Sequence, residues 1–234
     1  MTHELKIAID ALYKTFVIHS ATSSMEGCPC CVSNADKEQL HTKQLRQLDE
    51  DDLSRYAFKA ITTWGDTNDF KHYLPRIFEL LATTDFIVDT FVVFGKLDLG
   101  KWRTWTENEQ RSITEFLLAW WSDLIKNKLY FDKEAFTEIY KLLGNITELL
   151  DLWKINFDDN SFGNFVELIY NFYGDLTTKR KEFKDLDEGS AEELIKWIKF
   201  NSGILEKGFF YFEKKDNELA EKISTTLYVF ERMA

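Results

Sequence analysis

Apolar residues recur every three to four positions along most of this chain, and this spacing places them on one face of an α-helix. Residues 4–19 show the pattern clearly, with Leu5, Ala8, Ile9, Leu12 and Phe16 on one face. The same periodicity predicts further helices over residues 36–47, 86–94, 132–143, 145–155, 160–174, 191–213 and 217–233. The run at 86–94 also fits a buried strand, but a helix is predicted because no convincing partner strand exists elsewhere.

Several of the predicted helices begin at a capping residue. Asp49 and Asp66 each precede an apolar stripe, and Thr106 and Glu109 have the spacing of a capping box. The acidic run at 49–52 suits the positive end of a helix dipole, so we interpret it as a cap rather than a metal site. Pro75 lies inside the next stripe and predicts a kink or the start of a second helix.

These patterns predict an all-α fold of roughly ten helices in a globular bundle. Glycine is scarce at 10 residues, proline occurs twice, and 44% of the residues are hydrophobic. Few helix breakers and a large apolar fraction favour long packed helices over a turn-rich β fold. A solenoid-like stack of helical hairpins is the second alternative, because no fixed-period repeat is found. We predict a single domain over residues 1–234, with a soft boundary at the charged segment 177–190.

The chain is acidic, with 29 basic and 40 acidic side chains and a formal net charge of −11. Such a charge repels nucleic-acid phosphates and anionic lipid, so neither is predicted as a partner. The N-terminal residues contain no signal-peptide core, and no apolar run approaches the ~20 residues of a membrane span. We therefore predict a cytoplasmic protein with no membrane partner and with a protein as its partner.

The candidate chemistry is concentrated in Gly27-Cys28-Pro29-Cys30-Cys31, which holds all three cysteines. Cys28 and Cys31 have the spacing at which two thiolates bind one metal ion from a tight turn, and Cys30 and His41 are the candidates for further ligands. The zinc site is one interpretation; a reactive thiol and an ordinary turn are the others. His19 also flanks the cysteines, but it continues an apolar helix face. Cys30 is predicted to project away from the Cys28–Cys31 pair.

Two other patterns are weaker. Residues 95–101 have the glycine and lysine spacing of a phosphate-binding loop, but Trp102 stands where Ser or Thr would hold Mg²⁺. We predict an exposed connection there, with Trp102 and Trp105 packed onto the body. Pairs such as Glu38 with His41, and Asp69 with His72, have a spacing used in di-iron bundles. A solvent-exposed polar stripe is the preferred interpretation of these pairs, and Arg76 and Glu79 continue the stripe that begins with Asp69 and His72.

The chain resembles a family of uncharacterised bacterial helical proteins. The resemblance lies in the GCPCC loop, in DLSRYAFKA and TTWG after it, in FKHYLPR at 70–76, and in FLLAWW at 116–121. It covers about half of the chain and implies no function. It implies a bacterial, cytosolic origin and adds interest to Cys28, Cys31 and His72.

The sequence contains no recognised catalytic constellation, and only four histidines are present to carry acid–base chemistry. We therefore predict a non-catalytic protein that binds a protein partner, as an inhibitor, immunity protein or adaptor, with a structural zinc at the Cys28 loop. The alternative is a metal-dependent or thiol-based enzyme or sensor centred on Cys28 and Cys31.

Overall fold

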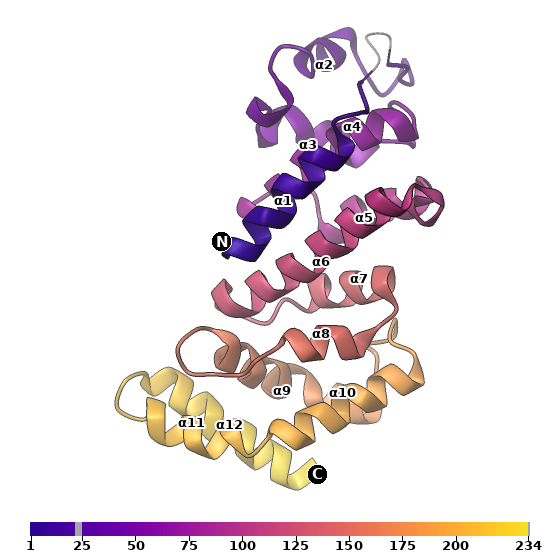
Figure 1. The fold of residues 1–234 in the computed structure, drawn as a ribbon. Helices are drawn as coiled ribbons and strands as arrows, with labels where there is room; N and C mark the ends of the chain where they lie inside the picture. Colours follow the sequence, from indigo (N-terminus) through magenta and orange to yellow (C-terminus); the bar gives the residue numbers. More distant parts are fainter. Residues whose placement is uncertain (22–24, 234) are drawn as a thin grey trace. The chain divides into compact units, whose positions relative to one another are not determined.

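The computed structural model describes residues 1–21 and 25–233. This part of the chain contains twelve α-helices, two short 3-10 helices and no β-strand (Figure 1). The all-α fold predicted from the sequence is confirmed. None of the helices in these residues is both long enough and apolar enough to cross a membrane.

Contacts along the chain divide it into two compact units, Met1–Trp120 and Trp121–Ala234. The division falls inside α6 (Glu107–Asn127), and the predicted soft boundary at 177–190 lies within the second unit.

The first unit is built around a pair of packed helices, α1 and α4. The predicted stripe of α1, from Leu5 to Phe16, is buried. The 3-10 helices η1 and η2 contact α4 and α5, respectively, and α3 contacts both α4 and α5. The helices of this unit that precede α6 are α1 (His3–Phe16), α2 (Asn34–Gln39), η1 (Leu45–Gln47), α3 (Glu50–Lys59), α4 (Thr67–Thr83), α5 (Thr90–Leu99) and η2 (Trp102–Thr104).

The second unit consists of helices joined by short connections. Helix α12 packs on α9 and α11, and α10 packs on α8 and α9. Its core is rich in aromatic rings: the Trp153 ring centroid lies 5.6 Å from that of Trp121 and 5.2 Å from that of Trp197. The helices that follow α6 are α7 (Lys133–Leu143), α8 (Ile146–Leu152), α9 (Ser161–Thr178), α10 (Glu188–Asn201), α11 (Ile204–Phe212) and α12 (Asn217–Met233).

The predicted helix starts are confirmed. Asp49 caps α3 and Asp66 caps α4, each in a capping box. At the start of α6 the Glu109 carboxylate accepts from the Thr106 N–H at 2.9 Å. These caps satisfy N–H groups that have no partner within the helix, which is why local sequence is enough to predict them.

Several predicted boundaries are wrong. The helix predicted over 36–47 is two short helices, α2 and η1, and the one predicted over 191–213 is divided into α10 and α11. Residues 86–89 are a loop, and α5 begins only at Thr90. Helix α4 continues through Pro75, so no second helix begins there. Apolar periodicity marks which face is buried, but it does not mark where a turn interrupts the helix.

Candidate metal and thiol site

The three cysteines lie in a turn between α1 and α2 that is held against the turn following α3. The Cys28 N–H donates to the Thr63 carbonyl at 2.8 Å, and the Gly65 N–H donates to the Glu26 carbonyl at 2.7 Å. Gly65 has φ +68°, a left-handed conformation that glycine adopts without strain. Two backbone hydrogen bonds therefore fix the position of the cysteine turn.

The sulfur atoms of Cys28, Cys30 and Cys31 gather together. Cys30 Sγ lies 2.9 Å from Cys28 Sγ and 3.5 Å from Cys31 Sγ, and all three lie within 4.8 Å of one another. The prediction that Cys30 projects away is therefore wrong. The Cys31 N–H donates to the Cys28 carbonyl at 2.8 Å, and this tight turn leaves the middle thiol between the outer two. Cys30 is exposed, while Cys28 and Cys31 are half-buried.

Hydrogen bonding makes the thiols unequal. The hydrogen bonds of Cys28 with the Cys30 side chain and backbone lower the pKa of the Cys28 thiol. The same contact with Cys28, together with the hydrogen bond to Cys31, raises the pKa of Cys30 to about 11. Cys28 therefore ionises before Cys30, and Cys30 is the thiol that supplies its hydrogen bond.

Two cations from α3 hold the same turn. Arg55 Nη2 donates to the Cys31 carbonyl at 3.1 Å, and Lys59 Nζ donates to it at 2.5 Å. Arg55 also pairs with Asp36, with Nε 3.3 Å from Oδ1. Both cations therefore hold the backbone of the cysteine turn against α3.

His41 and His19 do not join the cysteines. His41 is exposed in the turn after α2 and lies outside the group of sulfur atoms. Among the residues that the structure describes, the three cysteines form the one group of three or more His, Cys, Asp and Glu side chains close enough to share an ion. The predicted ligands Cys28, Cys30 and Cys31 are thus brought together, and His41 is not.

His19 belongs to a separate ionic cluster at the start of α6. His19 Nε2 lies 2.6 Å from Glu109 Oε1 and Nδ1 lies 2.9 Å from Asn68 Oδ1, while Lys71 Nζ lies 2.8 Å from the same Glu109 oxygen. Burial acts to raise the pKa of Glu109, but the hydrogen bonds from Lys71, the Thr106 N–H and His19 outweigh it and lower the pKa to about 2. Glu109 is therefore held as a carboxylate.

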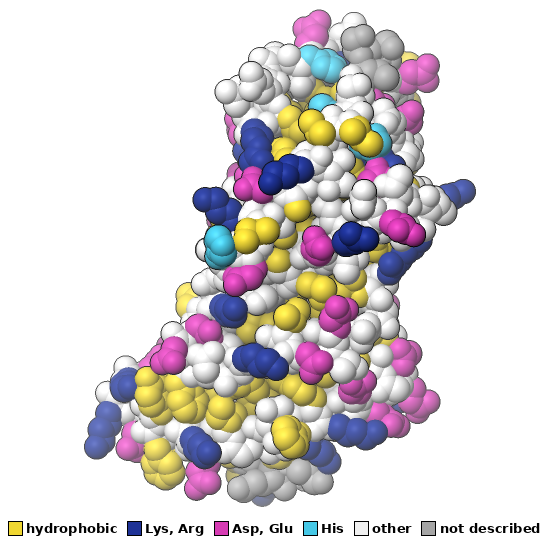
Figure 2. Space-filling model, viewed as in Figure 1, with side chains coloured by type: hydrophobic (Ala, Val, Ile, Leu, Met, Phe, Trp, Pro, Cys, Tyr) yellow, Lys and Arg dark blue, Asp and Glu magenta, His cyan; other side chains and the backbone are white. Residues whose placement is uncertain are grey.

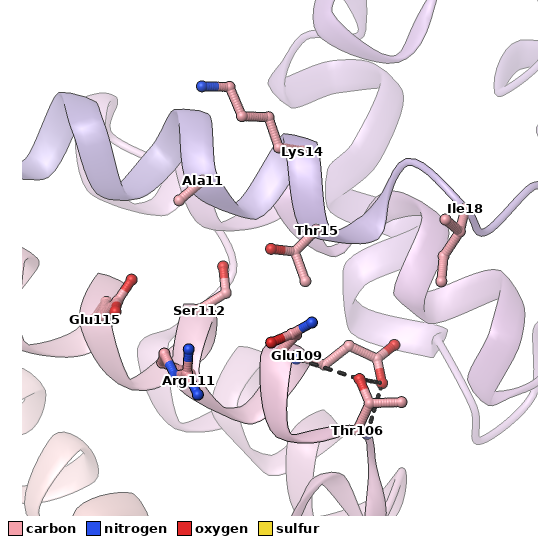
Figure 3. Close-up of a pocket in the computed structure, with 10 residues that line it drawn as sticks. Ala11, Lys14, Thr15, Ile18, Thr106, Glu109, Arg111, Ser112 and Glu115 are labelled. Atoms are coloured by element: carbon pink, nitrogen blue, oxygen red, sulfur yellow. Dashed lines mark hydrogen bonds between the residues drawn. The ribbon is translucent and has the colours of Figure 1, made fainter.

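A groove of about 660 Å³ lies beside this cluster, between α1 and α6. Figure 3 shows Thr15 and Ser112 pointing into the space between these helices. Ser112 Oγ is buried and has no hydrogen-bond partner. The other polar lining residues include Lys14 and Arg111, which are positively charged, and Glu115, which is negatively charged. With charges of both signs, the groove selects no ligand class as clearly as the cysteines do.

The prediction that one polar stripe faces solvent is wrong. This stripe consists of Asp69, His72, Arg76 and Glu79. Asp69 is only 3% exposed. His72 Nδ1 lies 3.0 Å from the His19 carbonyl, and the Tyr13 hydroxyl of α1 donates to Glu79 at 2.6 Å. These side chains therefore join α4 to α1 and to the loop that follows α1.

The glycine and lysine spacing at 95–101 does not form a phosphate-binding loop. Residues 95–99 belong to helix α5, so the prediction of an exposed connection is wrong for these residues. Lys96 is buried, and its Nζ donates to the Phe58 carbonyl at 2.7 Å. Trp102 and Trp105 are buried, as predicted.

The sequence did not predict the contacts of Arg55 and Lys59 with the cysteine turn, and it predicted Glu109 only as a capping residue. Arg55 and Lys59 are four residues apart, and a helical wheel places them on one face of the predicted helix. No local signal places the Cys31 carbonyl on that face, because 24 residues separate Cys31 from Arg55.

Comparison with protein-family models, curated proteins and solved structures finds no match to this chain.

Proposed function

We propose that the protein is a binding protein that holds a soft metal ion such as zinc between the thiols of Cys28, Cys30 and Cys31. The observation that carries this proposal is the gathering of three sulfur atoms within 4.8 Å of one another. Thiolates are preferred ligands of zinc and Cu(I). Sulfur atoms bound to one tetrahedral zinc lie about 3.8 Å apart, so the Cys28–Cys30 distance has to widen by somewhat less than about 1 Å.

Three thiolates leave one position of a tetrahedral ion open. In this proposal, water or a side chain of the partner protein takes that position. Arg55 and Lys59 hold the backbone of the turn that carries the thiols. A cytoplasmic location is part of the proposal, because a reducing compartment keeps the thiols free. A partner-binding role as an inhibitor, immunity protein or adaptor fits a site that a partner completes, and nucleic acid is not proposed as a partner of this acidic chain.

The test is a metal titration of protein purified without a histidine tag and stripped of metal. We expect one zinc per chain, with cobalt substitution giving the absorption of a thiolate-bound tetrahedral ion. Cys28→Ser, Cys30→Ser and Cys31→Ser should each weaken binding at least about tenfold, because each removes one of three ligands. His41→Ala is the matched control and should bind like the wild type.

The affinity for zinc should rise with pH, because the thiols must lose protons to bind. Absence of stoichiometric zinc, or binding that survives all three serine variants, would contradict the proposal.

A thiol sensor is the second candidate function, and the lowered pKa of Cys28 beside Cys30 favours it. Two thiols would form a disulfide by giving two electrons and two protons to a peroxide, which is reduced to water. Faster peroxide oxidation of this protein than of a free thiol, lost in Cys28→Ser, would support the sensor. Zinc binding in the absence of such reactivity would favour the metal site.

A further inference from the structure

We propose that a groove between α3 and residues 87–92 docks an acidic segment of a partner protein that carries large apolar side chains. The groove has a volume of about 390 Å³ and includes Phe58 of α3 and Val92 of α5 in its lining. The inference rests on the proposed function only in requiring a protein partner; it does not require the metal.

The walls of the groove are apolar and exposed. Phe58 is 58% exposed and Ile87 is 80% exposed, and Phe91, one residue before Val92, is 53% exposed. The residues from 86 to 94 form an apolar run of a kind that is normally buried. Large apolar side chains that stay exposed next to one another mark sites of protein association.

The charged residues that line the groove determine which charge a partner segment should carry. Arg55 and Lys59 both line it, against one acidic lining residue, Asp89. Arg55 is already paired with Asp36, so Lys59 is the cation that the groove offers to a partner's carboxylate. A segment with glutamate or aspartate beside its apolar side chains would complement it, and opposite charges at the edge of an apolar contact steer the correct partner.

The groove has a firm frame. Lys96 of α5 donates to the Phe58 carbonyl at 2.7 Å, which ties the end of α3 to α5. A groove that is preformed in this way loses less conformational entropy when a peptide binds.

The same two cations connect the groove to the cysteine turn. Arg55 and Lys59 line the groove and also donate to the Cys31 carbonyl. A carboxylate that pairs with Lys59 would therefore lie near the backbone of the cysteine turn.

The test uses two fluorescein-labelled peptide libraries, in which a central leucine or phenylalanine is flanked either by glutamates or by lysines. Fluorescence polarisation of the wild-type chain should show binding of the glutamate library at least about tenfold tighter than of the lysine library. Phe58→Ser and Ile87→Ser should each weaken binding by about tenfold or more. Lys59→Gln, which keeps a donor for the Cys31 carbonyl, should weaken binding several-fold and reduce its salt dependence.

Matched controls lie outside the groove. Lys14→Gln removes a cation from α1, and Phe210→Ser removes a side chain of α11 that is 63% exposed; neither should change binding. If Phe58→Ser does not fold, Ile87→Ser in the loop still tests the groove.

Three results would overturn the inference. The first is that the glutamate library does not bind at concentrations up to about 1 mM. The second is that binding survives both Phe58→Ser and Ile87→Ser. The third is that the groove is occupied instead by a fatty acid such as decanoate or by a second copy of the chain. Zinc titration of the same samples separates the two proposals: a chain that binds zinc but neither library contradicts only the docking groove.

Discussion

The two units of this chain differ in how many charged side chains they bury. Of the five buried charged side chains among the described residues, four lie in the first unit and one in the second: Asp52, Asp69, Lys96 and Glu109, against Asp123. Ring contacts occur in both units, and in the second unit Trp153 contacts three other rings. Hydrophobic side chains also gather on its surface over α11 and α12 (Figure 2).

This difference explains why the candidate chemistry lies in the first unit. Apolar rings pack well between regular helices, but they do not hold an irregular turn in one conformation. Charged groups and backbone hydrogen bonds have directional partners, so they fix the loop after α1 at Glu109 and the cysteine turn at Thr63.

The largest expected effect is in the aromatic core of the second unit. Trp153→Ala should lower the free energy of unfolding by about 3–5 kcal/mol, because it removes a buried ring and leaves a cavity. Trp153 is only 2% exposed. Urea unfolding followed by circular dichroism measures the change. A loss below about 1 kcal/mol would show that the rings are not the main support of this unit.

The next effect is in the ionic cluster of the first unit. Glu109→Gln leaves Lys71 and His19, which are both half-buried, without their carboxylate and should cost about 3 kcal/mol at neutral pH. The wild-type carboxylate has its pKa lowered from 4.5 to about 2. Its contribution is therefore present above pH 4.5 and is lost as the pH falls from 4.5 to about 2, where wild type and variant should converge. Urea unfolding at several pH values tests this; a constant difference would contradict it.

A smaller effect compares two glycines of the second unit. Gly208→Ala should cost about 1–3 kcal/mol, because the new Cβ overlaps the Phe162 ring. Gly163→Ala is the matched control: its Cβ would meet open space, and the substitution should stabilise α9 by about 0.5–1 kcal/mol. Thermal unfolding of both variants gives the comparison. Equal effects of the two substitutions would show that α11 does not pack closely on Phe162.

The smallest expected effect compares one buried tryptophan of each unit, of which only one makes a side-chain hydrogen bond. Trp153 Nε1 donates to the Ser161 carbonyl at 3.0 Å, whereas the buried Trp64 Nε1 of the first unit has no partner. Both Trp→Phe substitutions lose ring volume, but only Trp153→Phe also loses a hydrogen bond. We expect it to cost about 1 kcal/mol more than Trp64→Phe in urea unfolding. The opposite order would indicate that Trp64 has a partner in solution.

Local sequence was sufficient to predict the helical class, the buried face of α1 and the caps of α3, α4 and α6. Each depends on residues within about one or two turns of a helix, so periodicity and capping chemistry are sufficient. The sequence also singled out the cysteine turn, because all three cysteines fall within four positions.

The tertiary structure alone decided how that turn is arranged and what surrounds it. It placed Cys30 between the other thiols, left His41 outside, brought Arg55 and Lys59 to the Cys31 carbonyl, and exposed Phe58. Most of these arrangements depend on how distant segments pack against one another, and no local pattern encodes the partner of a backbone carbonyl. The chemistry of a site is therefore set by long-range packing, even where its ligands are adjacent in the sequence.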